Sequence, residues 1–271
     1  MSRKYATPAL LVLAFTVATI AFVSPRTPQP PSYHNFADQR SWLGLPNFGD
    51  VVSNVGFAIV GIWGLWFLLR LGPDQVATHF FHPSERWCYA LVFLGMLLTA
   101  AGSANYHLAP DNARLVWDRL PMTIVFMSLV TAIIAERIST PAALCLCPLL
   151  LAIGIFSVLA WYWSEQAGHG DLRPYAAVQV YAVLMLLLVL FLPSRYTRSM
   201  DLAVVVGLYV LAKSFETFDR KIFALGHLVS GHTLKHLAAA LAGYWILRML
   251  EKRKPLRGTE LSGPRIASPQ T

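Results

Sequence analysis

Charged residues are scarce in this sequence. Only 13% of its 271 residues are Asp, Glu, Lys or Arg, whereas 56% are hydrophobic. Soluble domains carry about 25% charged residues, so this composition excludes an ordinary soluble domain and predicts an integral membrane protein. The formal net charge is +8, but the 22 basic residues are scattered singly between apolar runs or gathered near the C-terminus. That distribution is typical of membrane topology rather than of nucleic-acid binding.

Cysteine is also rare, and several catalytic and binding motifs are missing. The three cysteines, Cys88, Cys145 and Cys147, lie in apolar stretches, so they indicate no disulfide framework, and the last two lack zinc-finger spacing. The sequence has no phosphate-binding P-loop, no G-x-S-x-G nucleophile motif and no dinucleotide fingerprint. Internal repeats are not evident, which disfavours a transporter built from inverted repeats.

Long apolar runs are what the sequence has in abundance. A helix needs about 20 mostly apolar residues to cross the hydrocarbon core of a membrane. Eight runs approach that length, and we therefore expect an all-α, polytopic transmembrane bundle. The runs cover residues 8–23, 51–69, 87–107, 120–135, 141–163, 175–192, 202–218 and 232–250.

The first run differs from the other seven in its surroundings. Two basic residues precede it and a proline follows it, as in a secretory signal peptide, but the residues at its end form a poor cleavage site. We therefore favour an uncleaved membrane anchor over a signal peptide for residues 1–24. We expect a seven-helix core over residues 25–250 and a disordered, basic tail over residues 251–271.

The basic residues in the loops predict the orientation of the chain. If the N-terminus lies in the cytoplasm, the loops on that side hold the larger share of Lys and Arg, as cytoplasmic loops do. We therefore expect both termini in the cytoplasm. The run ends that hold His107, Asp118 and His232 then all lie at the outer side of the membrane.

Two histidines four residues apart, His232 and His236, open the last run. Four residues advance a helix by about 6 Å and slightly more than one turn, so both imidazoles lie on one face and can bind one ion. His107 ends an earlier run at the same side of the membrane. A packing role is the ordinary explanation for one such histidine, but ionisable groups inside membranes are costly and tend to mark function. Together the three predict a metal site.

Asp118 and Ser103 are candidates for the remaining parts of a hydrolytic site. Three imidazoles with an open fourth position are typical of a catalytic zinc ion. Hydrolysis also needs a base for the water and a donor for the developing oxyanion. Asp118, at the start of the next run, can be the base, and Ser103, one turn before His107, can be the donor. The ordinary alternatives are a helix N-cap for Asp118 and a packing hydroxyl for Ser103.

Lys213, Glu216 and Asp219 follow one another at intervals of three residues near the outer end of the seventh run. They predict a local ion-pair ladder, and the alternative is a supporting role in which a carboxylate orients a metal-bound imidazole. We expect Lys235 to point away from the two histidines that flank it and to pair with Glu216 or Asp219.

The loop before the second run contains Asp38, Asn47 and Asp50, whose side chains offer the hard oxygen atoms that calcium prefers. The ordinary explanation is that Asn47 and Asp50 are turn and capping residues ahead of a helix. Both interpretations are open at this point.

Five residues agree in order, spacing and helix position with the alkaline ceramidase family: Ser103, His107, Asp118, His232 and His236. The chain resembles that family, which lies in a superfamily of seven-helix membrane hydrolases that includes the adiponectin receptors. The resemblance implies a zinc-dependent amidase that cleaves the N-acyl bond of ceramide, or of a ceramide-like lipid, into a fatty acid and an amine base. It further implies that the histidines hold zinc, that Asp118 activates water and that Ser103 steadies the oxyanion.

The resemblance covers the chain from about residue 47 to about residue 250, and the chain looks closer to bacterial members of the family. It therefore implies a bacterial plasma membrane. Eukaryotic members place part of a calcium site before the first core helix, but here Asn47 stands where a glutamate is expected. An alternative of another class is a receptor or sensor, like the adiponectin receptors, in which zinc is structural. The hydrolase hypothesis implies a membrane lipid as the substrate and no nucleic-acid partner, and the oligomeric state is open.

Overall fold

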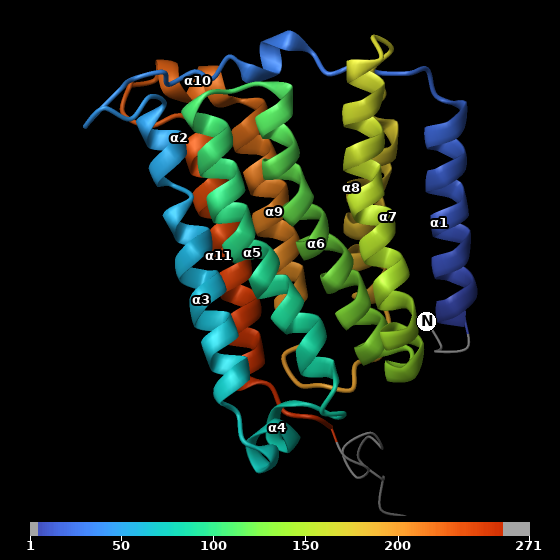
Figure 1. Ribbon diagram of the computed structural model, residues 1–271. Coiled ribbons are helices and arrows are strands. Elements are labelled where there is room, and N and C mark those ends of the chain that lie inside the picture. Colours follow the sequence, from blue (N-terminus) through green and yellow to red (C-terminus); the bar gives the residue numbers. More distant parts are fainter. Residues whose placement is uncertain (1–4, 257–271) are drawn as a thin grey trace, which may run out of the picture.

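The computed structural model describes residues 5–256, and these residues form an all-α bundle without a β-strand (Figure 1). The eight apolar runs of the sequence are helical over most of their length, but a turn at residues 53–54 interrupts the second run, and the helices of the sixth and seventh runs end at Val189 and Thr217, before their runs do. The helices are α1 (Ala6–Val23), α2 (Phe48–Val52), α3 (Val55–Arg70), α4 (Pro73–His79), α5 (Glu85–Leu108), α6 (Asn112–Arg137), α7 (Thr140–Gln166), α8 (Arg173–Val189), α9 (Asp201–Thr217), α10 (Asp219–Ala224) and α11 (Gly231–Lys252), with a 3-10 turn, η2, at Pro31–His34.

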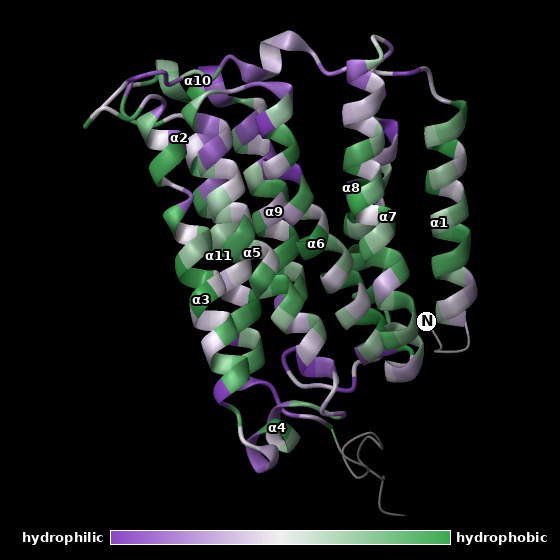
Figure 2. Cartoon of the chain, in the orientation of Figure 1, coloured by the Kyte–Doolittle hydropathy of each residue, from purple (hydrophilic) through white to green (hydrophobic). Residues whose placement is uncertain are grey.

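Within residues 5–256, five stretches are long and apolar enough to cross a membrane by length and composition. They are α1, the stretch Phe48–Arg70 formed by α2 and α3, α5, α6 and α7. Hydrophobic residues cover the middle of the bundle and hydrophilic residues gather at its two ends (Figure 2). Large apolar side chains such as Phe15 and Phe156 are exposed along the helices, as in a surface that faces lipid. The chain is a membrane protein.

The helix α1 lies at the edge of the bundle, where it packs mainly along α8 (Figure 1). In the body of the bundle each helix contacts the next in the order α6, α5, α3, α11 and α9, and α7 and α8 pack against α6. The division into a seven-helix core and one additional helix stays a prediction that the edge position of α1 supports. The chain enters α1 and leaves α11 at the same end of the bundle (Figure 1).

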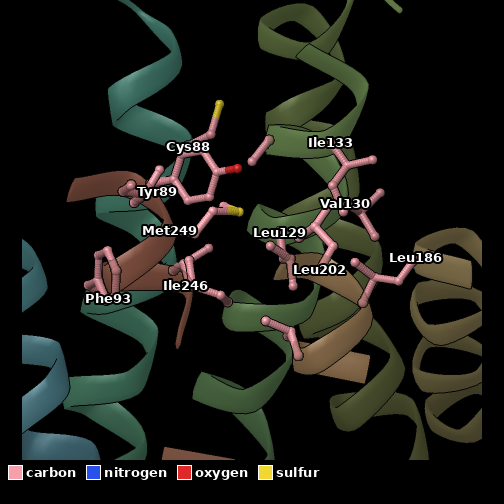
Figure 3. Close-up of a cluster of buried hydrophobic side chains, with 14 of the residues drawn as sticks. Cys88, Tyr89, Phe93, Leu129, Val130, Ile133, Leu186, Leu202, Ile246 and Met249 are labelled. Carbon is pink, nitrogen blue, oxygen red and sulfur yellow. The ribbon is translucent and has the colours of Figure 1, made fainter. Parts of the chain in front are cut away.

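A cluster of apolar side chains locks the helices together in the half of the bundle nearest those two chain ends. Tyr89 and Phe93 on α5 lie beside Ile246 on α11, and Ile133 on α6 lies across the same cluster from them (Figure 3). Ile133, Phe93 and Tyr89 are fully buried. Lipid is as apolar as these side chains, so close van der Waals packing between them, and not transfer out of water, sets the relative positions of the helices.

A glycine brings α5 and α6 unusually close together near the opposite end. A Cβ atom built at Gly102 would lie 2.0 Å from the carbonyl oxygen of Trp117 on α6. Only a residue without a side chain allows that approach. Because Ser103 and Asp118 follow these two residues, the contact also sets Ser103 beside Asp118.

The end of the chain departs from the predicted disordered tail at residues 251–271. Glu251 and Lys252 complete α11, and Arg253 is only 1% exposed. Its guanidinium pairs with buried Glu136 on α6 and lies over the ring of Tyr196 at 4.0 Å. The tail prediction is therefore wrong for residues 251–256. Residues 257–271, like residues 1–4 of the predicted anchor, lie outside the described part of the chain.

We expect Gly102→Ala to destabilise the protein by about 1–3 kcal/mol, because the new methyl group meets backbone that cannot rotate away. The matched control is Gly207→Ala on α9, where an added Cβ has nothing within 4 Å. That substitution should be neutral or stabilising by up to about 1 kcal/mol. Thermal unfolding of the purified proteins in detergent measures both effects. Equal unfolding temperatures for the two variants would contradict the proposed close contact.

Candidate metal centre

The structure brings the three histidines together, as their spacing predicts. His107 lies in the last turn of α5, and His232 and His236 lie in the first two turns of α11. Their candidate ligand atoms are within 4.8 Å of one another, and all three side chains are buried. Three buried imidazoles that converge in this way could hold a metal ion.

The hydrogen bonds of the histidines fit such an ion. The Nδ1 atom of His107 is buried and has no hydrogen-bond partner among the described residues, so it retains its capacity to bind. The Nδ1 atom of His236 lies 2.7 Å from the hydroxyl of Ser53, which itself donates to the carbonyl of Asp50. Ser53 therefore accepts from Nδ1–H, and this tautomer leaves the lone pair of Nε2 free for a metal. Sequence reasoning missed Ser53, because it belongs to no spacing motif.

Two carboxylates hold the start of α11, which carries two of the three histidines. Asp219 accepts a hydrogen bond of 2.8 Å from the backbone N–H of His232. Asp50 accepts from the hydroxyls of Ser230, at 3.0 Å, and of Thr233, at 2.7 Å. The expectation that Asp219 joins an ion-pair ladder or orients an imidazole is therefore wrong. Its charge instead lies at the N-terminus of a helix, where a negative charge is favourable.

The remaining members of the predicted ladder do pair. Glu216 accepts from Lys213 and, at 2.7 Å, from Nζ of Lys235, which confirms one of the two partners predicted for Lys235. The expectation that Lys235 points away from its histidine neighbours is wrong. Its Nζ atom lies 3.4 Å from Nε2 of His232, three residues earlier on the same helix face.

Asp118 lies farther inside α6 than its run predicts. The helix begins at Asn112 and not near Leu120, because the side chain of Asp111 caps it by accepting from the N–H of Arg114 at 2.7 Å. The N-cap interpretation of Asp118 is therefore wrong, since Asp118 sits about two turns into the helix. It is buried, and it lines the same cavity as Ser103.

A cavity of about 140 Å³ begins at these polar groups and continues into the apolar bundle. Ser103, Asp118, Lys235 and His236 form its polar end. From His236 the cavity extends along α11 as far as Ile246, ten residues or about 15 Å. Apolar residues line the rest of it, among them Val92, Met96, Leu129, Leu186 and Val206.

An aromatic ring covers the histidines on the side away from this cavity. The segment between α1 and α2 crosses the end of the bundle as an extended strap (Figure 1). Phe36 of this strap is 4% exposed, and its ring centroid lies 4.6 Å from that of His107 and 4.7 Å from that of His232. His34 fastens the strap to α5 through Tyr106, at 2.9 Å. Neither role is visible in the sequence, because both contacts join segments about 70 residues apart or more.

The three calcium candidates have separate partners. Arg40 binds the carboxylate of Asp38, and this hydrogen-bonded pair lowers the pKa of Asp38 below its ordinary value. Asn47, in a left-handed backbone conformation that Asn tolerates, donates to the carbonyl of His107 at 2.8 Å. Asp50 supports α11 as described above, and one of its oxygens has no partner among the described residues. Calcium binding stays a prediction.

In comparisons with known proteins, no family model and no curated protein matches the chain. The assignment of this centre therefore depends on its own geometry and chemistry.

We expect His236→Ala to abolish stoichiometric metal binding, because two imidazoles alone do not complete a metal site. Ser53→Ala should weaken metal affinity by about 10- to 100-fold, as typically follows the loss of a group that orients a ligand. Elemental analysis and competition with a chelator measure both. His82→Ala is the control, because it removes an exposed histidine that is not part of the cluster. Full metal occupancy in His236→Ala would exclude this centre.

Proposed function

We propose that the protein is a zinc-dependent membrane hydrolase that cleaves the N-acyl bond of ceramide or of a ceramide-like N-acyl lipid. One observation carries the proposal. A buried histidine triad adjoins a carboxylate and a hydroxyl at the polar end of an apolar cavity inside a membrane bundle. This combination matches what the resemblance to alkaline ceramidases implies.

The cavity supports a lipid substrate rather than a water-soluble one. An acyl chain occupies apolar space between helices at little cost, because it leaves one hydrocarbon environment for another. The depth of about 15 Å along α11 suits a chain whose polar end stays beside the histidines. Phe36 and the strap cover the opposite side, so the arrangement favours access from the bilayer.

The ligand set supports zinc as the metal. Three histidines with an open position are the ligand set of several catalytic zinc sites, and hard cations such as calcium and magnesium prefer oxygen. When bound, zinc polarises a carbonyl group and makes water a stronger nucleophile near neutral pH.

Asp118 and Ser103 supply the remaining chemistry in this proposal. Asp118 takes the proton that the attacking water loses as the new C–O bond forms. Ser103 donates a hydrogen bond to the acyl oxygen as negative charge develops there. Asp118 then passes the proton to the nitrogen as the C–N bond breaks, so that the products are a fatty acid and an amine.

The topology supports a site at the outer side of a plasma membrane, with both termini in the cytoplasm. The histidines lie at the end of the bundle away from both Ala6 and Lys252 (Figure 1). Basic residues of the loops are more numerous at the end that holds Ala6 and Lys252. The bacterial origin of that membrane comes from the family resemblance alone.

We expect Asp118→Asn to abolish release of fatty acid from N-acyl lipids while the metal stays bound. Ser103→Ala should slow release by about 100- to 1000-fold, the usual effect of removing one oxyanion donor. Mass spectrometry of the lipid products and elemental analysis of the protein measure the two quantities. Asp111→Asn on the same helix is the matched control, because Asn caps a helix about as well as Asp.

Turnover by the wild type and by Asp111→Asn, but not by Asp118→Asn, would support the hydrolase. If Asp118→Asn turned over as fast as the wild type, Asp118 would not be the base. Metal binding without turnover on any N-acyl lipid would instead favour a receptor with structural zinc.

A further inference from the structure

Lys235 is a largely buried cation whose role the proposed reaction leaves open. Its side chain is 16% exposed, and it lies between two candidate metal ligands on α11. Glu216, with a side chain 17% exposed, is its ion-pair partner, but Lys213 shares that same carboxylate. Two ammonium groups therefore share one carboxylate, and Asp118, at the same end of the cavity, is a second negative charge near Lys235.

The hydrogen-bonding capacity of Lys235 is also only partly used. An ammonium group has three N–H donors and no acceptor. One donor goes to Glu216 at 2.7 Å, and a second lies 3.4 Å from Nε2 of His232. The lone pair of that nitrogen can bind Lys235 or a metal ion, but not both. Occupation by a metal would therefore leave up to two donors of Lys235 for another acceptor.

The position of Lys235 indicates where that acceptor would lie. Its side chain forms the polar end of the apolar cavity with Ser103, Asp118 and His236. A ligand whose hydrocarbon chain fills the cavity places its polar end beside this ammonium group. Burial excludes competing water, so a charge-assisted hydrogen bond to an oxygen is stronger here than at a surface.

We infer that Lys235 recognises the acyl end of the lipid: its ammonium group binds the carbonyl oxygen of an N-acyl substrate and the carboxylate of the fatty acid that hydrolysis releases. The inference deepens the proposed function and depends on it for the identity of the substrate. Its test is independent of turnover, because a fatty acid can bind to protein without metal.

The experiment compares binding of palmitic acid and of hexadecanol to metal-free protein, under alkaline conditions that ionise the acid. The two probes have the same hydrocarbon chain, so their affinity ratio isolates the carboxylate. We expect the wild type to prefer the acid by about 10- to 100-fold, the range for a hydrogen bond to a charged group. Because every variant is measured in the same detergent, partitioning into micelles cancels between proteins.

Lys235→Met should remove the preference for the acid and leave binding of the alcohol nearly unchanged, whereas Lys235→Arg should keep most of the preference. Lys213→Met is the matched control, since it removes the other ammonium group from Glu216, at a side chain 51% exposed. A preference that survives in Lys235→Met would overturn the inference. A wild type that binds acid and alcohol equally would overturn it without any variant, even if Lys235→Met did not fold.

Measured together, the preference for the acid and the release of fatty acid distinguish the binding role of Lys235 from the proposed hydrolase activity. A preference for the acid that depends on Lys235, in a protein that releases no fatty acid from any N-acyl lipid, would keep the binding role of Lys235 and reject the amidase. Turnover with no such preference would do the reverse.

Discussion

Three imidazoles buried in an apolar bundle must find partners within the protein, because neither lipid nor bulk water can solvate them there. Several residues around the histidines provide such partners. Ser53 binds one imidazole nitrogen, Asp219 binds the backbone at His232, and Phe36 packs its ring on two of the histidines. The nitrogen of His107 that remains without a partner gives the cluster its capacity for a metal ion. The centre is thus held by contacts from three separate parts of the chain besides the helices that carry the histidines.

The two ends of the helical bundle have different roles. Near the two described chain ends, an apolar cluster and the buried pair of Arg253 with Glu136 fix the helices rigidly. At the other end the same helices carry polar groups around a cavity. Rigid packing at one end and the close contact at Gly102 add to the contacts of the site itself in fixing its geometry. This division suits a reaction on a substrate that arrives from the bilayer.

The sequence alone predicted those features that depend on local spacing. The apolar runs predicted the helices, because a chain in lipid must satisfy the hydrogen bonds of its own backbone. The spacing of His232 and His236 predicted their shared face, because residues four apart lie on one side of a helix. Features for which neighbouring residues compete, such as the capping of a helix, were harder to predict. Asp111 took the capping position that Asp118 was a candidate for, and that choice moved the start of α6 by about two turns.

Contacts across the chain were the hardest to foresee. Phe36 is separated from His107 by about 70 residues of sequence and from His232 by nearly 200, and no periodicity marks it. The direction of Lys235 depended on the carboxylate offered by α9, not on its own helix. The prediction of a disordered tail was wrong for Arg253, because composition does not reveal that a buried carboxylate, Glu136, is its ion-pair partner.

The most direct test of the central claim is X-ray absorption at the zinc edge on purified protein loaded with zinc. We expect a first shell of nitrogen and oxygen at about 2.0–2.1 Å, with the multiple-scattering pattern of three imidazoles and one further light atom. That pattern should disappear in a variant that lacks one of the three histidines. A shell that contains sulfur at about 2.3 Å, or one built from oxygen without imidazole scattering, would contradict the three-histidine centre and the chemistry proposed around it.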